Sequence, residues 1–323
     1  MSVSVVPPPQ AARHQKYDRL VTSAQALPRL KVAVAHPCDA AALGAALEAA
    51  DLGLIEPILV GPPGRIAAAA AAAGRDLAGV RQVAAAHSHD SAAKAVELVR
   101  CGEADALMKG SLHTDELMAA VVARDTGLRT ARRISHCFVM DVPNHEGALI
   151  VTDAAINIAP SLEEKRHIVQ NAIDLARALH FDEPRVAILS AMETVNPDVP
   201  STIEAAALCK MADRGQITGG VVDGPLALDN AIDLGSAQIK HISSPVAGRA
   251  NILVVPDLEA GNMLAKSLTF LADADAAGIV LGARVPIILT SRADSRLTRL
   301  ASCAVACLLA EAQRVAARAA LEV

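Results

Sequence analysis

Short apolar runs alternate with longer amphipathic segments along most of this chain. The runs at 31–35 and 55–60 have the length and the β-favouring residues of buried strands. The segment 39–52 between them has the spacing of a helix, with Asp39 as its expected N-cap. Strands separated by helical segments are typical of βαβ units, so the pattern predicts an α/β fold with a largely parallel sheet.

A second series of the same kind begins near residue 135. The runs at 134–140 and 148–152 are so close in sequence that they predict a locally antiparallel pair of strands. Residues 162–178 predict a long amphipathic helix. Further helices are predicted at 201–213, 229–237, 261–272 and 296–319.

The change of pattern near Asp141 indicates a boundary between two units, although no linker marks it. We expect a first α/β domain made of residues 21–140 and 278–323. The second α/β domain is expected to contain residues 141–277. Residues 1–20 include three consecutive prolines and are expected to form a loosely attached tail.

Composition excludes several classes of ligand. The chain is 52% hydrophobic but only 1% aromatic, and its formal net charge is −5. A core of Ala, Val, Ile and Leu suits close packing of helices on a sheet, whereas the scarcity of aromatic rings argues against base stacking. No general basic surface invites nucleic acid. An anionic ligand must therefore be met by locally placed Arg and Lys.

The six cysteines are scattered, without the paired spacing of a zinc site or a disulfide framework. Cys303 and Cys307 are expected to pack inside the last helix. No signal peptide is recognisable, and the alanine run 67–73 is bracketed by Arg65 and Arg75, well short of a membrane span. We therefore expect a cytoplasmic protein that contacts no membrane.

The stretch 285–295, VPIILTSRADS, contains the most informative chemistry. An apolar strand breaks into polar residues, as happens where a strand of an open α/β sheet reaches the crevice at its carboxyl end. There Arg292 offers a planar fork for phosphate, Ser291 a neutral donor and Asp294 a proton acceptor. Alternatively, Ser291, Asp294 or Ser295 simply caps the helix that follows, which would leave Arg292 unexplained.

Four further groups of polar residues lie beside predicted strands. Around Gly110, which would allow close backbone approach, the chain places a lysine, two hydroxyls and an imidazole, although a capped turn with an exposed lysine would explain them equally well. An arginine-rich segment precedes one apolar strand. Hydroxyl, carboxylate and amide groups end a second strand, and carboxylates and an amide follow a third, around a turn expected at Gly224 and Pro225. These carboxylates could also bind a divalent metal, although they lack the D-x-D-x-D-G spacing of a calcium-binding loop. The candidate binding residues are Lys109, Ser111, His113, Thr114, Arg133, Ser135, Thr152, Asp153, Asn157, Asp229 and Asn230.

Five segments together resemble the ordered motifs of the phosphate acetyl/butyryltransferase family, to which phosphotransacetylases belong. The resemblance runs from about residue 20 to the end without large gaps. It implies reversible transfer of a short acyl group between coenzyme A and inorganic phosphate, with no metal or redox cofactor. It also implies a homodimer of chains with two α/β/α domains and a cleft between them, the fold of isocitrate and isopropylmalate dehydrogenases. The segments are 107–114, 152–160, 224–231, 256–266 and 285–295.

The resemblance also suggests roles for individual residues. In the acetyltransferase branch, a serine matching Ser291 is thought to form a hydrogen bond in the transition state, and an arginine matching Arg292 to hold phosphate. That branch has an aspartate seven residues after the serine, as the base for the thiol, where this chain has Thr298. Asp294 is then the nearest substitute. Lys109, His113 and Thr114 are expected on the opposite wall.

We favour direct transfer of the acyl group within a ternary complex, in which the enzyme binds the acyl donor and its co-substrate together. Cys137 is the one cysteine near these motifs that could carry an acyl group. We expect phosphate acetyltransferase rather than phosphate butyryltransferase activity, although the SRADS form resembles the butyryl side. A metal-dependent dehydrogenase on the same fold and a catalytically silent acyl-CoA-binding or assembly subunit remain alternatives.

Overall fold

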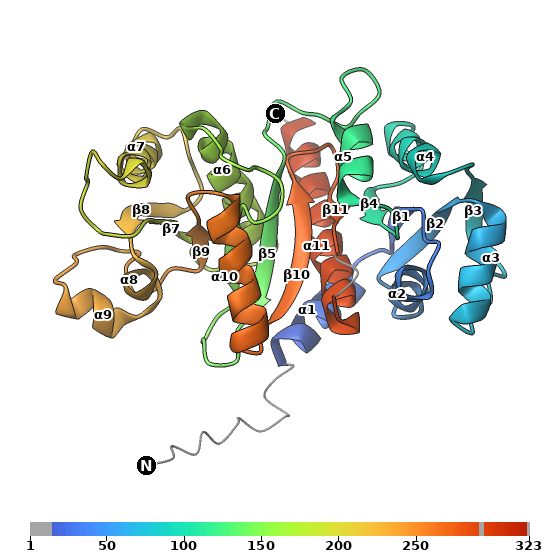
Figure 1. Cartoon of the computed structure of the whole chain (residues 1–323), viewed down its shortest axis with the longest axis horizontal. Coiled ribbons are helices and arrows are strands. Elements are labelled where there is room, and N and C mark those ends of the chain that lie inside the picture. The colour runs from blue at the N-terminus through green and yellow to red at the C-terminus, as the bar shows by residue number, and fades with distance from the viewer. Residues whose placement is uncertain (1–14, 291–293, 322–323) are drawn as a thin grey trace, which may run out of the picture.

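The computed structural model describes residues 15–290 and 294–321, and one mixed sheet runs through this part of the chain (Figure 1). The sheet has 11 strands in the order β3-β2-β1-β4-β11-β10-β5-β6-β9-β7-β8. The strands are β1 (Leu30–Ala35), β2 (Ile55–Gly61), β3 (Arg81–Ala84), β4 (Ala106–Lys109), β5 (Ser135–Asp141), β6 (Leu149–Thr152), β7 (Arg185–Leu189), β8 (Val221–Leu226), β9 (Ile252–Val254), β10 (Asp275–Leu281) and β11 (Ile287–Ile288).

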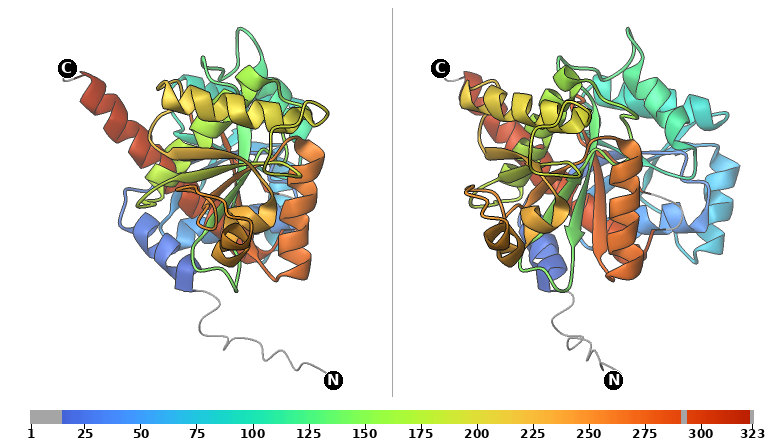
Figure 2. Two further views of the ribbon diagram at one scale, coloured as in Figure 1. Left: turned by 90° about the vertical axis from the view of Figure 1, so that its left-hand side faces the viewer. Right: turned by 60° about the vertical axis from the view of Figure 1, so that its left-hand side comes forward.

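Helices cover both faces of this sheet, and α10 and α11 lie on opposite sides of its central strands (Figure 2). The helices are α1 (Gln15–Gln25), α2 (Ala40–Asp51), α3 (Pro63–Ala72), α4 (Ser88–Arg100), α5 (Thr114–Val122), α6 (Leu162–Ala178), α7 (Pro200–Asp213), α8 (Leu228–Ile232), α9 (Leu234–Ile239), α10 (Leu258–Leu271) and α11 (Arg296–Leu321).

Alternation along the strands divides the core into layers. In β1, Val32 and Val34 face a continuous core beneath α1, α2, α3, α6, α7 and α11, while Ala33 and Ala35 face α4 and α5. A third cluster lies beneath α8, α9 and α10 on the same face as α4 and α5. This face is therefore covered in two separate blocks, with the central strands between them.

The central strands change direction where the two blocks meet. The parallel strands β1 to β4 continue into β11, which pairs with β4 in parallel and with β10 antiparallel. β5 pairs antiparallel with both β10 and β6, which confirms the pair expected at 134–140 and 148–152. The α/β class is confirmed, while the division into two domains near Asp141 stays a prediction.

Local sequence signals explain several helix starts. The Asp39 carboxylate accepts from the backbone N–H of Ala42 at 2.7 Å and begins α2 as expected. Ser161 and Glu164 form a reciprocal capping box at the start of α6, which spans the predicted range. Such caps satisfy backbone donors that have no partner inside the helix.

The structure corrects three local expectations. The predicted helix at 229–237 is two short helices, α8 and α9, because Asp233 is extended (φ −119°, ψ 118°) and caps α9. Gly224 and Pro225 lie inside β8 and not in a turn, which is possible because β8 is the edge strand and needs no N–H there. The expected tail of residues 1–20 overlaps α1, which begins at Gln15; residues 1–14 lie outside the described part.

The final helix α11 is a core element. By length and composition, its segment Arg296–Ala319 could cross a membrane, but most of the apolar stretch is buried within the fold. Cys303 and Cys307 are both buried there, as expected, and the Cys307 thiol donates to the carbonyl of Leu54.

Candidate active site

A hollow of about 180 Å³ lies at the carboxyl ends of β1, β4 and β11. Its walls include Asp39 at the start of α2, Lys109 and Gly110 after β4, Thr290 after β11, and Arg299 of α11. Segments far apart in the sequence meet here because parallel strands present their carboxyl ends at one edge of the sheet. Such an edge is where open α/β folds bind their ligands.

The loop after β4 is built around close backbone contact. A Cβ on Gly110 would come within 2.4 Å of the Ala35 carbonyl oxygen and 2.5 Å of that of His36, so only glycine fits. The Ser111 hydroxyl donates to the His36 carbonyl at 2.8 Å and accepts from the N–H of Cys38 at 3.2 Å. Gly110 therefore allows the close approach expected from the sequence, and Ser111 ties the loop after β4 to the loop after β1.

Lys109 is a buried cation in the wall of this hollow, with 6% of its surface exposed. Its ammonium group donates to the carbonyl oxygens of Gly110 (3.3 Å) and Leu112 (3.1 Å). The neighbouring His113 and Thr114 begin α5, and the Glu116 carboxylate accepts from the His113 N–H at 3.0 Å. Helix capping thus accounts for the backbone of His113, whose side chain is exposed.

Ser291 and Arg292 lie outside the described residues, so their side chains are not placed. The described chain reaches Thr290 in the wall of the hollow and resumes at Asp294. The N–H of Thr298 donates to the Ser295 hydroxyl at 3.1 Å, which makes Ser295 the cap of α11 and leaves that role unnecessary for Asp294. Thr298 itself is buried, and its hydroxyl accepts from Ser295 within the same cap.

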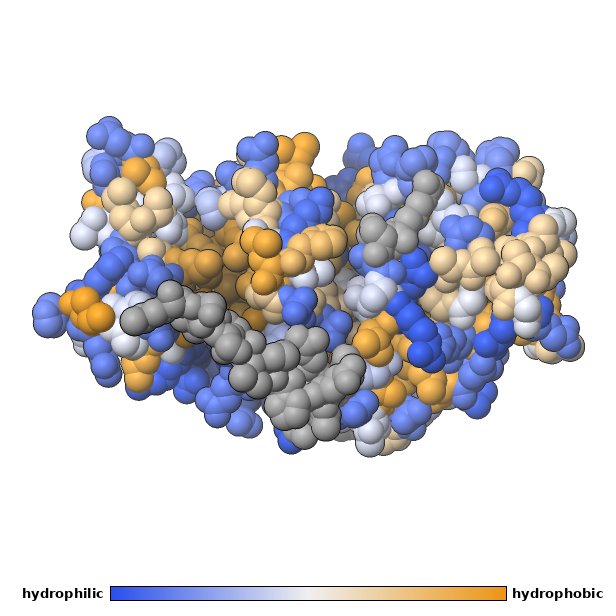
Figure 3. Space-filling model, turned by 60° about the horizontal axis from the view of Figure 1, so that its bottom comes forward, coloured by the Kyte–Doolittle hydropathy of each residue, from blue (hydrophilic) through white to orange (hydrophobic). Residues whose placement is uncertain are grey.

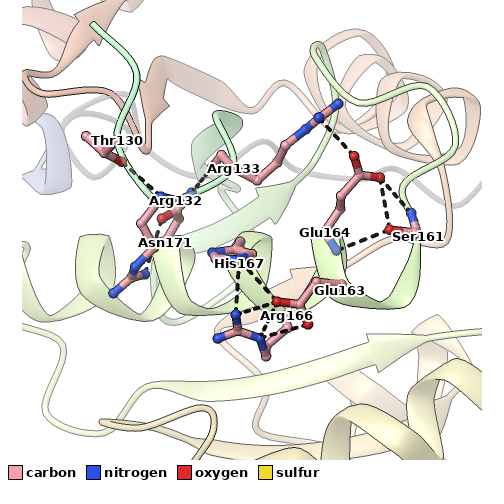
Figure 4. Close-up of polar contacts among 9 residues, drawn as sticks. All are labelled: Thr130, Arg132, Arg133, Ser161, Glu163, Glu164, Arg166, His167 and Asn171. Atoms are coloured by element: carbon pink, nitrogen blue, oxygen red, sulfur yellow. Dashed lines mark hydrogen bonds and ion pairs between the residues drawn. The ribbon is translucent and has the colours of Figure 1, made fainter.

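Arg133, Asp153 and Asn157 form a second group, beside the end of β6 and the start of β5. Arg133 donates from Nε to Asn157 Oδ1 at 2.7 Å. It also pairs with Glu164 of α6 at 2.9 Å (Figure 4). Asp153 accepts from three backbone N–H groups of the following turn at 2.9–3.2 Å, and from the Asn157 amide. The Asn157 amide also donates to the Ile134 carbonyl. These contacts hold the loop after β6 against the start of β5.

Ser135 and Thr152 are buried in structural hydrogen bonds. The Ser135 hydroxyl accepts from Asn171 of α6 at 2.8 Å, and the Thr152 hydroxyl donates to the His136 carbonyl at 2.9 Å. Arg132, beside Arg133, also reaches Asn171 (Figure 4). The polar side chains in this part of the predicted site therefore already form hydrogen bonds within the protein.

The register of the sheet fixes the separation of these two groups. Met108, Ile288, Ile279, Cys137 and Thr152 lie in one row across five neighbouring strands. Four steps of about 4.8 Å put the ends of the row roughly 19 Å apart. The groups at Lys109 and Thr152 therefore flank the central strands without touching.

Asp229 and Asn230 of α8 belong to a third group, near the end of β7. Lys240 pairs with Glu193 at 2.8 Å and lies 3.7 Å from Asp229. Asn230 is fully buried and donates to Glu193, while its Oδ1 has no hydrogen-bond partner in the described structure. The structure thus divides the predicted site residues into three groups.

His136 is a residue of the central strands that the sequence did not single out. It points from β5 to the same face as Phe138, and the two rings meet edge to face at 4.4 Å. A Cβ on Gly278 of β10 would come within 3.2 Å of His136 Nε2, so the glycine makes room for this ring. Burial lowers the pKa of His136 to about 4, against the opposing influence of Asp153. In the sequence, only the position of His136 beside Ser135 could have suggested that His136 belongs to this group.

No metal cluster complements these groups: no three His, Cys, Asp or Glu side chains gather at one point in the described residues.

The fold resembles solved structures of known enzymes. A phosphotransacetylase from Streptococcus pyogenes superposes with a TM-score of 0.78 at 24% identity, over 91% of this chain and 98% of that one. A 4-hydroxythreonine-4-phosphate dehydrogenase from Klebsiella pneumoniae gives 0.51 at 14% identity, over 87% of this chain and 99% of that one. The class is therefore an α/β fold of the isocitrate dehydrogenase type, as the motifs implied.

Sequence comparison identifies the family. The profile described as "Phosphate acetyl/butaryl transferase" matches residues 80–307. A phosphate acetyltransferase of Rhizobium meliloti is 66% identical over 310 residues, which cover 96% of this chain and 98% of that protein. The chain belongs to the phosphate acetyl/butyryltransferase family, and it is a phosphate acyltransferase. The family inferred from the five motifs is thereby confirmed.

Proposed function

We propose that this enzyme transfers an acetyl group reversibly between coenzyme A and inorganic phosphate. The observation that carries the proposal is the 66% identity to a phosphate acetyltransferase across nearly the whole of both chains. The hollow beside Thr290 supports it, because the chain leaves this hollow directly into Ser291 and Arg292. In this account, acyl transfer takes place at the carboxyl end of β11.

In the direction of acetyl-CoA synthesis, a coenzyme A thiolate attacks the carbonyl carbon of acetyl phosphate and phosphate leaves. Arg292 binds the leaving phosphate through two parallel hydrogen bonds and offsets its developing charge. Ser291 donates a hydrogen bond in the transition state. Lys109, whose ammonium group is buried in the wall of the same hollow, adds positive charge there.

The thiol must lose its proton before it attacks, because a thiol with a pKa of ~8.5 is largely protonated near neutral pH. Asp294 is the proposed acceptor, since Ser295 caps α11 and Thr298 cannot accept a proton in this range. The acetyl group passes directly between the two substrates. Cys137, the cysteine near the motifs, is buried, and burial raises its pKa to about 12.

The groups around Asp153 and Asn230 have a different role in this proposal. Their internal hydrogen bonds hold the turn after β6 and tie α8 to the loop after β7, so we assign them a structural role.

The test is an assay of purified protein with acetyl-CoA and phosphate, without metal or NAD, in which free thiol is measured. Phosphate-dependent thiol release supports the transferase. Coenzyme A binding without turnover would instead indicate a silent binding subunit, and activity that requires metal and NAD would indicate a dehydrogenase. A parallel series with butyryl-CoA measures the acyl preference, which we expect to favour acetyl.

We also propose that the enzyme is a cytoplasmic homodimer. Apolar side chains on α10 remain exposed in the single chain, and they are the proposed contact with a second copy.

A further inference from the structure

A second and larger hollow adjoins the one beside Thr290. It measures about 390 Å³, shares Asp39 with the smaller hollow, and lies at the same edge of the sheet. Arg65, His36 and Ser111 contribute to its walls. Arg65 and His36 belong to none of the polar groups that the sequence pattern indicated.

Arg65 is held in this hollow by a buried histidine. Ser91 donates its hydroxyl proton to the His87 carbonyl at 2.8 Å, so it accepts from Nδ1–H of His36 at 3.0 Å. The other ring nitrogen of His36 is then free of a proton and accepts from the Arg65 guanidinium at 3.3 Å. A chain of hydrogen bonds thus runs from the core at Ser91 to the cation at the surface.

This partner orients Arg65 but does not neutralise it. His36 is 3% exposed, and its pKa is lowered first by burial and then by the positive charge of Arg65, which keeps the ring uncharged. No carboxylate of the described chain forms an ion pair with Arg65. By contrast, Arg75, beyond the other end of α3, pairs with Asp51 at 2.5 Å. A fixed arginine without a counter-ion, in the wall of a hollow, is suited to binding an anion.

The acidic side chains of the hollow form hydrogen bonds with groups other than Arg65. Asp39 accepts from the N–H of Ala42, and Glu116 accepts from the Ser88 hydroxyl at 2.8 Å and the His113 N–H at 3.0 Å. Both acids stand at helix N-termini, whose partial positive charge offsets them. The helices α2, α3, α4 and α5 all begin beside this hollow, which further favours a negative ligand.

We propose that Arg65, positioned by His36, binds a phosphate group of coenzyme A. This inference rests on the proposed function, which makes coenzyme A a substrate. The thiol of that molecule is separated from its pyrophosphate and its 3′-phosphate by the long pantetheine arm. A thiol at the hollow beside Thr290 therefore leaves the phosphate groups to reach a neighbouring site, and the hollow around Arg65 is contiguous with it.

The test is steady-state kinetics of Arg65→Gln with coenzyme A and acetyl phosphate. The variant loses a charge-assisted hydrogen bond at a partly exposed site, so we expect its KM for coenzyme A to rise roughly tenfold. The values of kcat and of KM for acetyl phosphate should stay near wild type. The matched control, Arg75→Gln, removes a surface arginine with a carboxylate partner and should leave the KM for coenzyme A unchanged.

Truncated substrates show which phosphate is bound. If Arg65 binds the 3′-phosphate, wild type and Arg65→Gln should have the same KM for dephospho-coenzyme A. If it binds the pyrophosphate, the difference should persist with dephospho-coenzyme A and vanish with pantetheine. An unchanged KM for coenzyme A in Arg65→Gln, or a defect that persists with pantetheine, would overturn the inference.

His36 variants test the positioning. His36→Phe keeps Arg65 but removes its acceptor, and it should raise the KM for coenzyme A by less than Arg65→Gln does. Arg65→Gln combined with His36→Phe should add nothing to Arg65→Gln alone, whereas independent additive effects would contradict positioning. Calorimetric titration of coenzyme A into each variant separates this inference from the proposed reaction: weaker binding supports the site even if wild type shows no transfer, and equal binding refutes it.

Discussion

Arg292 is the residue on which the proposed chemistry depends most. Arg292→Lys keeps the positive charge but loses the planar fork that grips phosphate at two points. By analogy with the removal of one transition-state donor, we expect kcat to fall by ~10²–10³. Steady-state kinetics with acetyl phosphate and coenzyme A measure this, and a variant within about threefold of wild type would remove Arg292 from the site.

Asp294 is the proposed base, and its variant has a distinctive dependence on pH. Asp294→Asn should lower kcat strongly near neutral pH, with a defect that shrinks as the pH rises toward ~8.5, where the thiol ionises unaided. A defect of constant size together with weaker phosphate binding would mean that Asp294 orients Arg292 instead. A wild-type-like pH profile would exclude both roles. Ser295→Ala, which removes the cap of α11, controls for loss of stability.

His136 should make the stability of the enzyme depend on pH. Its pKa is lowered to about 4 in the fold from an ordinary value of 6.5, so between these values the unfolded chain binds a proton that the folded chain excludes. The contribution of the neutral ring is therefore complete above pH 6.5 and is lost as the pH falls toward 4. This contribution amounts to at most about 3 kcal/mol.

Urea unfolding of wild type and His136→Gln at pH 7 and pH 5 tests this expectation. The difference between the two free energies of unfolding should be smaller in the variant, because glutamine does not titrate. His241→Gln, which changes an exposed histidine, should retain the wild-type dependence. Equal dependence in wild type and His136→Gln would show that His136 is not the group responsible.

At the scale of single elements, α2 links stability to the site. Asp39 caps this helix and also lines both hollows. Asp39→Ala should lower the free energy of unfolding by about 1 kcal/mol, whereas Asp39→Asn, which is an equivalent cap, should leave it nearly unchanged. Urea denaturation measures both, and equal stability of Asp39→Ala and wild type would contradict the capping role.

Elements with strong local signals could be predicted from the sequence. The helix α6 has an amphipathic repeat and a Ser-x-x-Glu box, and its observed limits are those expected. The break between α8 and α9 could not be foreseen, because Asp233 fits a helical pattern and only its extended backbone reveals the cap. The apolar strand expected before Ser291 pairs over only two residues, since pairing depends on its neighbours β4 and β10.

The site was predictable only where it depends on one loop. Lys109, Ser111 and Gly110 are neighbours in sequence, and the structure places them together in the walls of the adjoining hollows. The separation of Thr152 from this loop depends on the order of the intervening strands, which the sequence pattern does not specify. The contact between His36 and Arg65 joins residues 29 positions apart and is equally invisible to local patterns.

At the scale of the whole molecule, the exposed face of α10 predicts self-association. Met263 and Phe270 are seven residues apart, on one helix face, and are 62% and 75% exposed; Leu271 beside them is 86% exposed. Seen from below, apolar side chains lie among hydrophilic ones over the middle of the molecule (Figure 3). Pairing such surfaces across a twofold axis would bury them in a homodimer.

Sedimentation at micromolar concentration should show a mass of twice 33.3 kDa. Phe270→Glu, which places a charge in this surface, should shift the protein toward monomer, while Ile239→Glu, which charges an exposed apolar residue of α9, should do so less. A wild-type monomer at this concentration would contradict the dimer.

The most direct test of the proposed reaction follows both products at once. Purified enzyme is incubated with acetyl-CoA and phosphate. Acetyl phosphate is measured by phosphorus NMR, and free thiol is measured with a colorimetric thiol reagent. The account predicts equal amounts of acetyl phosphate and thiol, and it predicts that added coenzyme A drives the reaction backwards. Thiol release without acetyl phosphate would show that water, and not phosphate, accepts the acetyl group, and would contradict phosphate acetyl transfer.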